Sequence, residues 1–540
     1  MGKKYNAEEL NNLSGDMLVS IVLSMQSQMA AMLDRLKMMQ ETNDRLTEQL
    51  ALARNFRFGR SSEKLDAIDG QINLFNEVEA MADIEAVEEP DEDAVLEKVR
   101  VKRPKGKREA DLKGLPVEVI SHEMNDDDLK KIFTSGSWKE LPEETFRRVR
   151  YQPAQFTVEE HHVHVYAGDD NQTIVKADRP KSLIRSSIAT PSLVTAVINA
   201  KYVNALPLYR IEQEFKRNDI NISRQVMANW VIQCADRYLS LMYDRLHREL
   251  ISRYPVLQAD ETPVEVTKDG RPAGSKSYMW VYRSGYHYKN PVILYDYEKT
   301  RKADNPDEFL KDFSGILLSD GFSAYNKLSH DKGDIIMANC WVHARRKFSD
   351  ACKALKDKNQ LKKTVAYQAL EKIAVIYNLE NELCSLDPEE RLRCRISDIR
   401  PHVEEFFAWA KKVRDNGEVT LRGKTMEGIE YCLKRETQLK VFLSDGDVPI
   451  DNNATERAIR GFCIGRNNWR LIDTVRGANA SAMIYSLVET AKANGLRPHR
   501  YIEHLLQSIL DHYDDTDLEF LEDLLPWSET LPDECRKKAN

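Results

Sequence analysis

The stretch from residue 254 to 345 limits the folds open to this chain more than any other feature. Its apolar runs are short, rich in Val, Ile, Leu and aromatic residues, and bounded by Gly, Pro, Asn and Asp, which is typical of strands. Five such runs follow one another: YPVLQAD, YMWVYRS, PVILYDYE, GILLSD and DIIMANCW. A helix candidate, NPDEFLKDF, lies between the third and the fourth. The pattern predicts a mixed α/β core.

The predicted elements follow one another as three strands, a helix, a strand, a helix and a strand. This is the order of a ribonuclease H-like sheet, which we predict for 251–345. Two strands end in a carboxylate, Asp260 in LQADETP and Asp320 in LLSDGFSAY. A rigid sheet can hold such acids at the mouth of a site. Aspartates also end strands and open turns without any chemistry, so each of the two alone is a weak signal.

A third carboxylate follows a long helical stretch, 346–445, that carries no strand signal. In DNNATERAIRGFCIGRNNWRL, Asp451 is a natural N-cap and Glu456 lies in the first turns of the helix. This region is basic, with eight Lys or Arg against four acids over 451–500.

Three carboxylates can hold two divalent ions, which activate a nucleophile and stabilise the leaving oxygen in phosphodiester cleavage and strand transfer. Arginines beside the third acid, Arg457 and Arg460, would hold the phosphates. This chemistry explains why a helix that carries a carboxylate is itself basic. Without a role in metal binding, Glu456 would be interpreted as one partner of an ordinary ion pair on a helix surface.

The net charge of −8 conceals a basic body. Residues 77–97 and 511–534 each carry ten acids and no base, and without these 20 acids the chain is at +12. A basic body suits a polyanion such as DNA, and we expect the acidic stretches to be solvating or self-masking. A soluble enzyme without a nucleic-acid role has the same composition. Seven bases over 98–108 follow the first acidic block, which predicts a disordered linker over 66–112.

Composition also bears on the compartment. No apolar run approaches the ~20 residues that a bilayer crossing needs, and polar side chains interrupt the uncharged stretch Met17–Leu33. Eight cysteines, none in a CxxC pair, argue against a disulfide framework. We therefore expect a cytoplasmic protein without a membrane partner.

The first 65 residues carry a heptad repeat. Apolar residues alternate spacings of three and four, and polar Asn43 takes an a position, which fixes register in two-stranded coils. This predicts a coiled coil that joins two or more copies of the chain; a helical hairpin packed on the chain's own body is the alternative. The predicted dimerisation residues are Val22, Met25, Met29, Leu36, Asn43 and Leu50.

Residues 190–250 are helical in pattern and include a pair of helices that resembles helix–turn–helix. The first helix ends near Arg217. Ser223 caps the second, in which Val226 and Trp230 are predicted to face inward. Such pairs occur in any α domain, so a purely structural role is the alternative. The residues predicted to face DNA from the second helix are Arg224, Gln225 and Asn229.

Several segments, in this order, resemble the IS sixty-six family of bacterial DDE transposases: LQADETP, LLSDGFSAYN, CWVHARRKF and IDNNATERAIRGFCIGRNNW. The resemblance runs from FRFGRSSEKLD to YSLVETAKANGLRPHRYIEHLL and so covers nearly the whole chain. It implies that Asp260, Asp320 and Glu456 are catalytic acids that hold two Mg²⁺ or Mn²⁺ ions. In addition, Cys340 and His343 match the Cys-x-x-His motif of the family. The DNA-contacting residues predicted around these motifs are His343, Arg345, Arg346, Arg457, Arg460 and Arg466.

Two departures from the family pattern matter. Many members carry the paired cysteines of a small zinc module in the region that corresponds to 113–180, whereas this chain has no cysteine before Cys234, so no zinc is expected. Gly461 replaces a proline that usually follows the catalytic glutamate, which we expect to loosen the helix end and leave the acid intact.

The histidines of the β-rich region are predicted to lie on a strand surface: His161, His162 and His164.

The chain is thus expected to bind the terminal inverted repeats of its element, cut their 3′ ends and join them to target DNA. Accessory proteins encoded by the same element are further candidate partners. The alternatives are a DNA-binding regulator with a decayed core and a ribonuclease H-like nuclease without strand transfer. A two-carboxylate glycosidase would leave the arginine-rich helix unexplained.

The predicted organisation is a multidomain α/β protein. Its segments are a coiled coil (1–65), a charged linker (66–112), a small β-rich module (113–189), a helix–turn–helix-like region (190–250), a ribonuclease H-like core in two parts (251–345 and 446–495), an all-α insertion (346–445) and a C-terminal helical segment with an acidic tail (496–540).

Overall fold

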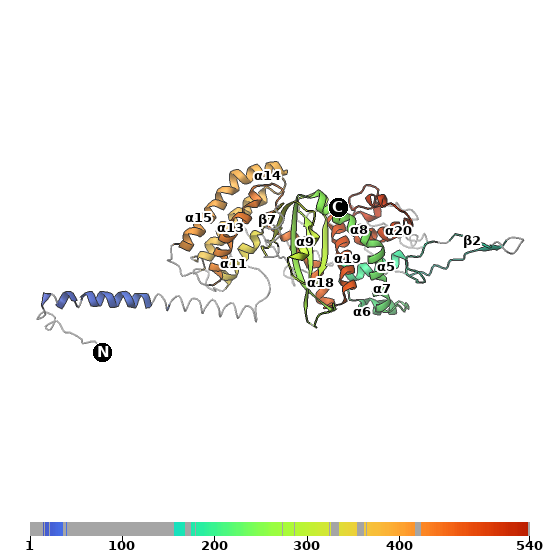
Figure 1. Cartoon of the computed structure of the whole chain (residues 1–540), viewed down its shortest axis with the longest axis horizontal. Coiled ribbons are helices and arrows are strands. Elements are labelled where there is room, and N and C mark those ends of the chain that lie inside the picture. The colour runs from blue at the N-terminus through green and yellow to red at the C-terminus, as the bar shows by residue number, and fades with distance from the viewer. Residues whose placement is uncertain are drawn as a thin grey trace, which may run out of the picture. The chain divides into compact units, whose positions relative to one another are not determined.

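The chain divides into two compact units, residues 1–88 with 183–536 and residues 89–182 with 537–540. The predicted linker over 66–112 lies outside the described part. The computed structural model describes residues 14–15, 17–20, 22–35, 39, 156–167, 174–178, 180–272, 274–285, 287–322, 325, 334–353, 361–362, 364–415 and 423–537 (Figure 1).

In the smaller unit, the described residues form a hairpin of two short antiparallel strands, β1 (Val165–Ala167) and β2 (Ile174–Lys176). His161, His162 and His164 all precede β1 and are exposed, so their predicted surface position is confirmed and their predicted place on a strand is wrong. His161 and His162 each lie within 3.5 Å of a glutamate two positions earlier in the chain. They are surface side chains with acidic neighbours.

The larger unit is built on a mixed six-stranded sheet (Figure 1). Its first three strands are antiparallel neighbours and the next two run parallel to the first, which gives the order β5-β4-β3-β6-β7. A short last strand pairs with the far end of β3. The predicted mixed α/β class is confirmed. The strands are β3 (Val256–Lys268), β4 (Lys276–Ser284), β5 (Ile293–Glu298), β6 (Gly315–Ser319), β7 (Ile335–Asn339) and β8 (Ile472–Thr474).

Helices cover both faces of this sheet and its β5 edge. They include α8 (Ser240–Arg253), α9 (Asp304–Phe309), α18 (Asn453–Trp469) and α19 (Val475–Ala493). On one face, Tyr282 of β4 stacks on Phe309, with ring centroids 3.9 Å apart. On the other, the Tyr295 hydroxyl donates to a backbone carbonyl of α18 at 2.7 Å. The hydroxyls of Ser486 and Thr490 in α19 accept from backbone N–H groups of β5, which an edge strand would otherwise expose.

The helices before the sheet include the predicted pair around a turn. They are α5 (Pro191–Ile198), α6 (Leu208–Arg217), α7 (Arg224–Cys234) and α8, with π-helical turns over Asn199–Val203 and Ala235–Leu239. Ser223 caps α7 as predicted, because its side chain accepts from the Val226 N–H. Val226 itself is 39% exposed, so its predicted inward orientation is wrong. The buried stripe instead runs through Met227, Trp230 and Cys234, at helical spacing that leaves Val226 to one side.

Helices fill the chain between β7 and α18, and the described residues of 346–445 contain no strand. Trp341 and Phe406 belong to one hydrophobic cluster that also includes Val256 of β3 and Leu318 of β6. The helical segment and the sheet therefore share a core. The helices are α11 (Trp341–Lys353), α13 (Val365–Glu382), α14 (Pro388–Cys394), α15 (Arg400–Asp415), α16 (Lys424–Lys434) and α17 (Glu436–Leu439), with a π-helical turn over Arg395–Ile399 and a 3₁₀ turn over Val441–Leu443.

Helix α18 departs from prediction at both ends. Its N-cap residue is Asn452, one position after the predicted Asp451, whose Oδ1 instead accepts from the N–H two residues later at 3.0 Å. At the other end, the helix continues through Gly461 to Trp469, so the expectation of a loosened end is wrong. A Cβ at Gly461 would lie 3.2 Å from the Glu489 carboxylate of α19, so the end of that side chain lies beside this position.

The acidic C-terminal stretch is folded, which corrects the expectation of a solvating tail. Leu521 and Leu524 are buried, and Tyr501 of α20 (Pro498–Asp511) donates to the Leu524 carbonyl at 2.8 Å. All ten acids of 511–534 are exposed on this segment. Its leucines pack against the body of the protein, and the Glu522 carboxylate pairs with Arg245 of α8, so the stretch masks a basic residue as well as being folded.

A helix near the N-terminus, Met17–Arg35, has exposed side chains. By length and composition it is the one helix in the described residues that could cross a membrane, with none of it buried. Core helices of soluble proteins and signal sequences have the same length and composition. The predicted dimerisation residues on this helix are Val22, Met25 and Met29, all exposed. Those outside the described residues are Leu36, Asn43 and Leu50.

Candidate active site

Two of the predicted acids lie on neighbouring parallel strands: Asp320 follows β6, whereas Asp260 lies within β3, which continues to Lys268, so the prediction that its strand ends at Asp260 is wrong. β3 pairs with β6 so that Gln258 lies opposite Leu318. Asp260 and Asp320 each come two residues later, at the same end of the pairing. Asp320 leaves β6 in a turn, in which its Oδ1 accepts from the Phe322 N–H at 2.7 Å. Strand order thus brings together two acids that are sixty residues apart in the chain.

Glu456 approaches from helix α18, and the three acids interact. Burial raises the pKa of the Asp260 carboxyl well above its ordinary value. Three nearby carboxylates, those of Glu261, Asp320 and Glu456, raise it further. The structure therefore brings Asp260, Asp320 and Glu456 into one electrostatic cluster.

Glu261, the neighbour of Asp260 in β3, is held in a different way. Arg301 donates to its Oε1 from Nε at 2.6 Å, and the Tyr325 hydroxyl donates to its Oε2 at 2.9 Å. Burial raises the pKa of Glu261, while the Arg301 guanidinium lowers it. A cation thus offsets the charge of Glu261, whereas carboxylates surround Asp260. Asp260 is the better candidate for a metal ligand, a distinction that the sequence ADET does not make.

Helix α11 supplies the basic groups that face Glu456. Arg346 Nη2 lies 3.5 Å from Glu456 Oε1, and His343 Nε2 lies 3.9 Å from the same oxygen. Burial, together with the positive charge of Arg346, lowers the pKa of His343 to about 4. The imidazole is therefore neutral at pH 7, and Arg346 is the cation of the pair.

Helix α16 holds the loop that follows Asp320. Tyr431 donates to the Asp320 carbonyl, and Arg435 Nη2 donates to the Gly321 carbonyl at 3.0 Å. Gly321 has φ +82°, and a Cβ there would lie 2.2 Å from the Asn339 side-chain nitrogen, so the loop requires glycine. Sequence analysis missed Tyr431 and Arg435, because no local pattern links them to a strand end so far upstream.

The acids fit a hard divalent cation by their chemistry. Carboxylate oxygens are the ligands that Mg²⁺ and Mn²⁺ prefer. A cation would also offset the repulsion among carboxylates that raises the pKa of Asp260. Within the described ranges, no group of three or more His, Cys, Asp or Glu side chains is already arranged to hold a metal ion. In this arrangement Glu456 pairs with Arg346.

The predicted DNA-contacting residues lie on three helices. Arg466 makes its contacts within the protein: its guanidinium donates to Thr262 Oγ1 at 2.9 Å and to the Pro263 carbonyl, and so joins α18 to β3. The others are Arg224, Gln225 and Asn229, exposed on α7; Arg457 and Arg460, exposed on α18; and His343, Arg345 and Arg346, of intermediate exposure on α11.

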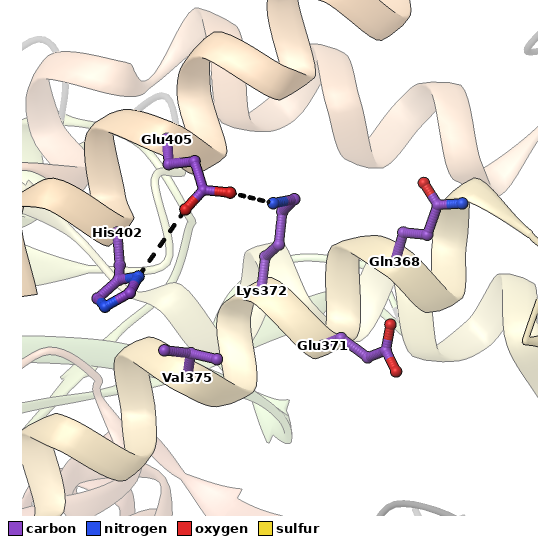
Figure 2. A pocket seen from close by; sticks show the side chains of 6 residues that line it. All are labelled: Gln368, Glu371, Lys372, Val375, His402 and Glu405. Atoms are coloured by element: carbon purple, nitrogen blue, oxygen red, sulfur yellow. Dashed lines mark hydrogen bonds and ion pairs between the residues drawn. The ribbon is translucent and has the colours of Figure 1, made fainter.

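An open hollow of about 490 Å³ lies between α13 and α15, away from the predicted acids (Figure 2). Figure 2 shows Lys372 and His402 on either side of Glu405, at 2.6 Å and 3.9 Å from its carboxylate oxygens. These polar side chains already partner one another. The lining residues are Gln368, Glu371, Lys372, Val375, His402 and Glu405.

Comparison with known families matches most of the chain. The family described as Transposase IS66 family matches residues 186–480, and the IS66 C-terminal element matches 486–527. A third description, Transposase C of IS166 homeodomain, matches 45–120. The chain belongs to the IS66 family of transposases, which confirms the predicted resemblance.

Relatives in Sinorhizobium fredii extend over similar lengths. Its uncharacterized protein y4qI is 30% identical over 520 residues, which are 92% of this chain and 92% of the relative. Its uncharacterized protein y4jD is 28% identical over 367 residues, 66% of this chain and 69% of the relative.

Proposed function

We propose that this transposase is a DDE enzyme of a bacterial insertion sequence, which cleaves the 3′ ends of its element and joins them to target DNA. One observation carries the proposal: the pairing of β3 with β6 places Asp260 and Asp320 at the same level of the sheet, and the Asn452 side chain ties the start of α18, which carries Glu456, to the residue before Asp260. Burial of like charges is costly unless a cation or a proton offsets it. Two divalent ions bound here would supply the positive charge that offsets these carboxylates.

The sheet supports a ribonuclease H-like core. Its order places the third, second, first, fourth and fifth strands side by side, with the first three antiparallel and the last two parallel to the first. Asp260 lies in the first strand, two residues beyond its pairing with the fourth, and Asp320 follows the fourth. This is the topology expected from the order of strands and helices in the sequence.

Each residue of the candidate site would have its own role in the reaction. Asp260 and Asp320 would hold the two ions, and Glu456 would complete the second site. Mg²⁺ or Mn²⁺ bound there would lower the pKa of a water molecule and stabilise the leaving oxygen. Arg346, beside Glu456, would donate to a phosphate oxygen of the DNA.

Two phosphoryl transfers make up the reaction. In the first, a water oxygen bonds to phosphorus and the P–O3′ bond breaks, which leaves a 3′-hydroxyl on the element. In the second, that 3′-oxygen bonds to a target phosphorus and the target's own P–O3′ bond breaks. The first step hydrolyses one phosphodiester bond. In the second, the attacking hydroxyl loses its proton to solvent, the leaving 3′-oxygen takes one up, and the number of phosphodiester bonds is conserved.

Recognition of the terminal inverted repeats belongs to other surfaces. Exposed Arg224, Gln225 and Asn229 make α7 the candidate recognition helix. The N-terminal coiled coil would join two or more copies, so that two element ends meet in one complex. The enzyme would act on chromosomal DNA in the bacterial cytoplasm, together with accessory proteins of the element where these are encoded.

A strand-transfer assay tests this function. Purified protein is incubated with labelled end DNA and a supercoiled target plasmid, with Mg²⁺, with Mn²⁺ or with EDTA. The proposal predicts metal-dependent products in which the labelled 3′ end is joined to the plasmid. Cleavage without joining would favour a nuclease. Binding without cleavage, with accessory proteins of the element present, would favour a regulator.

A further inference from the structure

Asn452, the residue before α18, is completely buried and bonds to two of the elements that bear acids. Its Nδ2 donates to the Ala259 carbonyl of β3 at 2.9 Å. Its Oδ1 accepts from Gln258 Nε2 at 3.1 Å and from Thr455 Oγ1 at 2.8 Å. One amide group therefore ties strand β3 to the first turn of helix α18.

Cys340 extends this connection to β6. Its backbone N–H donates to the Ser319 carbonyl at 3.0 Å, and its Sγ accepts from the Asn452 N–H at 3.2 Å. The thiol is completely buried. The cysteine of the Cys-x-x-His motif thus packs inside the protein, while the histidine of the motif, one turn later, faces Glu456.

The contacts converge on the residues that immediately precede the three acids. Ala259 precedes Asp260, and Thr455 precedes Glu456; both bond to Asn452 directly. Ser319 precedes Asp320 and bonds to Cys340, which bonds to Asn452 in turn. Because each contact is made next to an acid in the chain, it fixes the backbone from which that acid projects.

We propose that Asn452 and Cys340 are positioning residues that set the mutual spacing of the three acids and so their affinity for divalent ions. This inference rests on the proposed function. Mg²⁺ requires near-ideal octahedral geometry, so a small displacement of one carboxylate weakens its binding. Partners that orient metal ligands typically contribute about 10- to 100-fold in metal affinity.

The test compares two kinds of change in the full-length chain. Asn452→Asp keeps the size of the side chain but replaces the donor to the Ala259 carbonyl with a carboxylate oxygen. Asn468→Asp is its matched control, because Asn468 Nδ2 also donates to a backbone carbonyl, that of Ala205 at 2.9 Å, from the far end of α18. Cys340→Ala removes the sulfur acceptor, and Cys432→Ala removes another completely buried thiol as its control.

Binding of Mn²⁺ is measured by electron paramagnetic resonance without DNA, and folding is followed by circular dichroism and thermal unfolding. We expect Asn452→Asp to weaken Mn²⁺ binding by about tenfold or more, and Cys340→Ala by a smaller factor, with both controls unchanged. If both test variants keep their fold and bind Mn²⁺ within twofold of wild type, the inference is overturned. Should Asn452→Asp not fold, Cys340→Ala decides the result alone.

Failure of the proposed function gives a different result. Asp260→Asn in the same assay shows whether Mn²⁺ binding depends on the acids at all. If wild type and Asp260→Asn bind Mn²⁺ equally, the metal site itself is wrong and the inference falls with it. If Asp260→Asn loses Mn²⁺ while Asn452→Asp and Cys340→Ala retain it, only the positioning role is overturned.

Discussion

Tyr431 donates a hydrogen bond of 2.9 Å to the backbone carbonyl of Asp320, across 111 positions of the chain. The guanidinium carbon of Arg435 lies 4.4 Å from the centroid of the Tyr431 ring, and its Nη2 bonds the next carbonyl of the same loop. Helix α16 thus contacts the loop that carries an acid of the candidate site. The helical segment between β7 and α18 is part of the structure that holds the acids.

Removal of the Tyr431 hydroxyl tests that connection. We expect Tyr431→Phe to slow nicking of end DNA by about five- to tenfold, because one hydrogen bond contributes on the order of 1 kcal/mol to the position of Asp320. Binding of end DNA stays the same. Tyr377→Phe is the matched control, because the buried Tyr377 hydroxyl in the same helical segment has no hydrogen-bond partner. Equal nicking rates in the two variants would contradict the role of Tyr431.

A buried ion pair anchors the chain that leads into α18. Arg395 and Glu380 are both buried; Arg395 Nε donates to the glutamate at 3.0 Å, and Nη1 donates to the carbonyls of Phe442 and Asp445, each at 2.8 Å. Arg395→Met leaves a buried carboxylate without its cation, so we expect a loss of about 3–5 kcal/mol in urea unfolding. The double variant Glu380→Leu/Arg395→Met should recover part of this loss. A single variant as stable as wild type would contradict the account.

Asp296 on β5 makes stability depend on pH. Burial raises the pKa of its carboxyl from 3.8 to about 7, and the Glu298 charge adds to the shift. Because the folded state holds the proton more tightly than the unfolded state, this group's contribution to stability is lost as pH rises toward 7. Between pH 5 and pH 8, wild type should lose about 2–3 kcal/mol relative to Asp296→Asn in urea unfolding. A difference between the two proteins that does not change with pH would contradict this assignment.

The exposed face of α7 is the candidate reader of element ends. We expect Arg224→Ala/Gln225→Ala to bind end DNA more weakly by about 2 kcal/mol or more, with unchanged thermal stability, because both side chains are exposed. Arg217→Ala is the matched control, since Arg217 is also exposed, on α6, and pairs with Glu214. Gel-shift titrations of end DNA and unrelated DNA measure the difference. Equal losses for all three substitutions on both DNAs would indicate charge attraction alone.

Local pattern was enough to predict the strands and the cap at Ser223. Runs of β-branched and aromatic residues between turn formers mark strands, and Asp320 follows its strand as predicted, whereas the strand of Asp260 continues to Lys268 and its end was predicted wrongly. Two wrong predictions concerned the surroundings of single residues, Val226 and Gly461. Val226 lies beside the buried stripe of α7, and helix α18 continues through Gly461, where the Glu489 carboxylate of α19 lies beside the glycine.

Contacts between distant parts of the chain had no signature in the sequence. The bonds from Asn452 to β3 and from Tyr431 to the Asp320 loop depend on how the helical segment and α18 fold back onto the sheet. The acidic stretch 511–534 was misjudged for a related reason. Its charge count hides leucines such as Leu521, which are buried against the body of the protein.

Nicking of end DNA by single-acid variants shows whether Asp260, Asp320 and Glu456 are the catalytic acids. Asp260→Asn, Asp320→Asn and Glu456→Gln are compared with wild type, and with Glu265→Gln, which changes an exposed acid of the same strand β3. The account predicts that, with Mg²⁺ or Mn²⁺, wild type and Glu265→Gln nick at the 3′ end, whereas the other three bind the DNA but do not cut it. Metal-dependent cutting by Asp260→Asn at the wild-type rate would contradict the account.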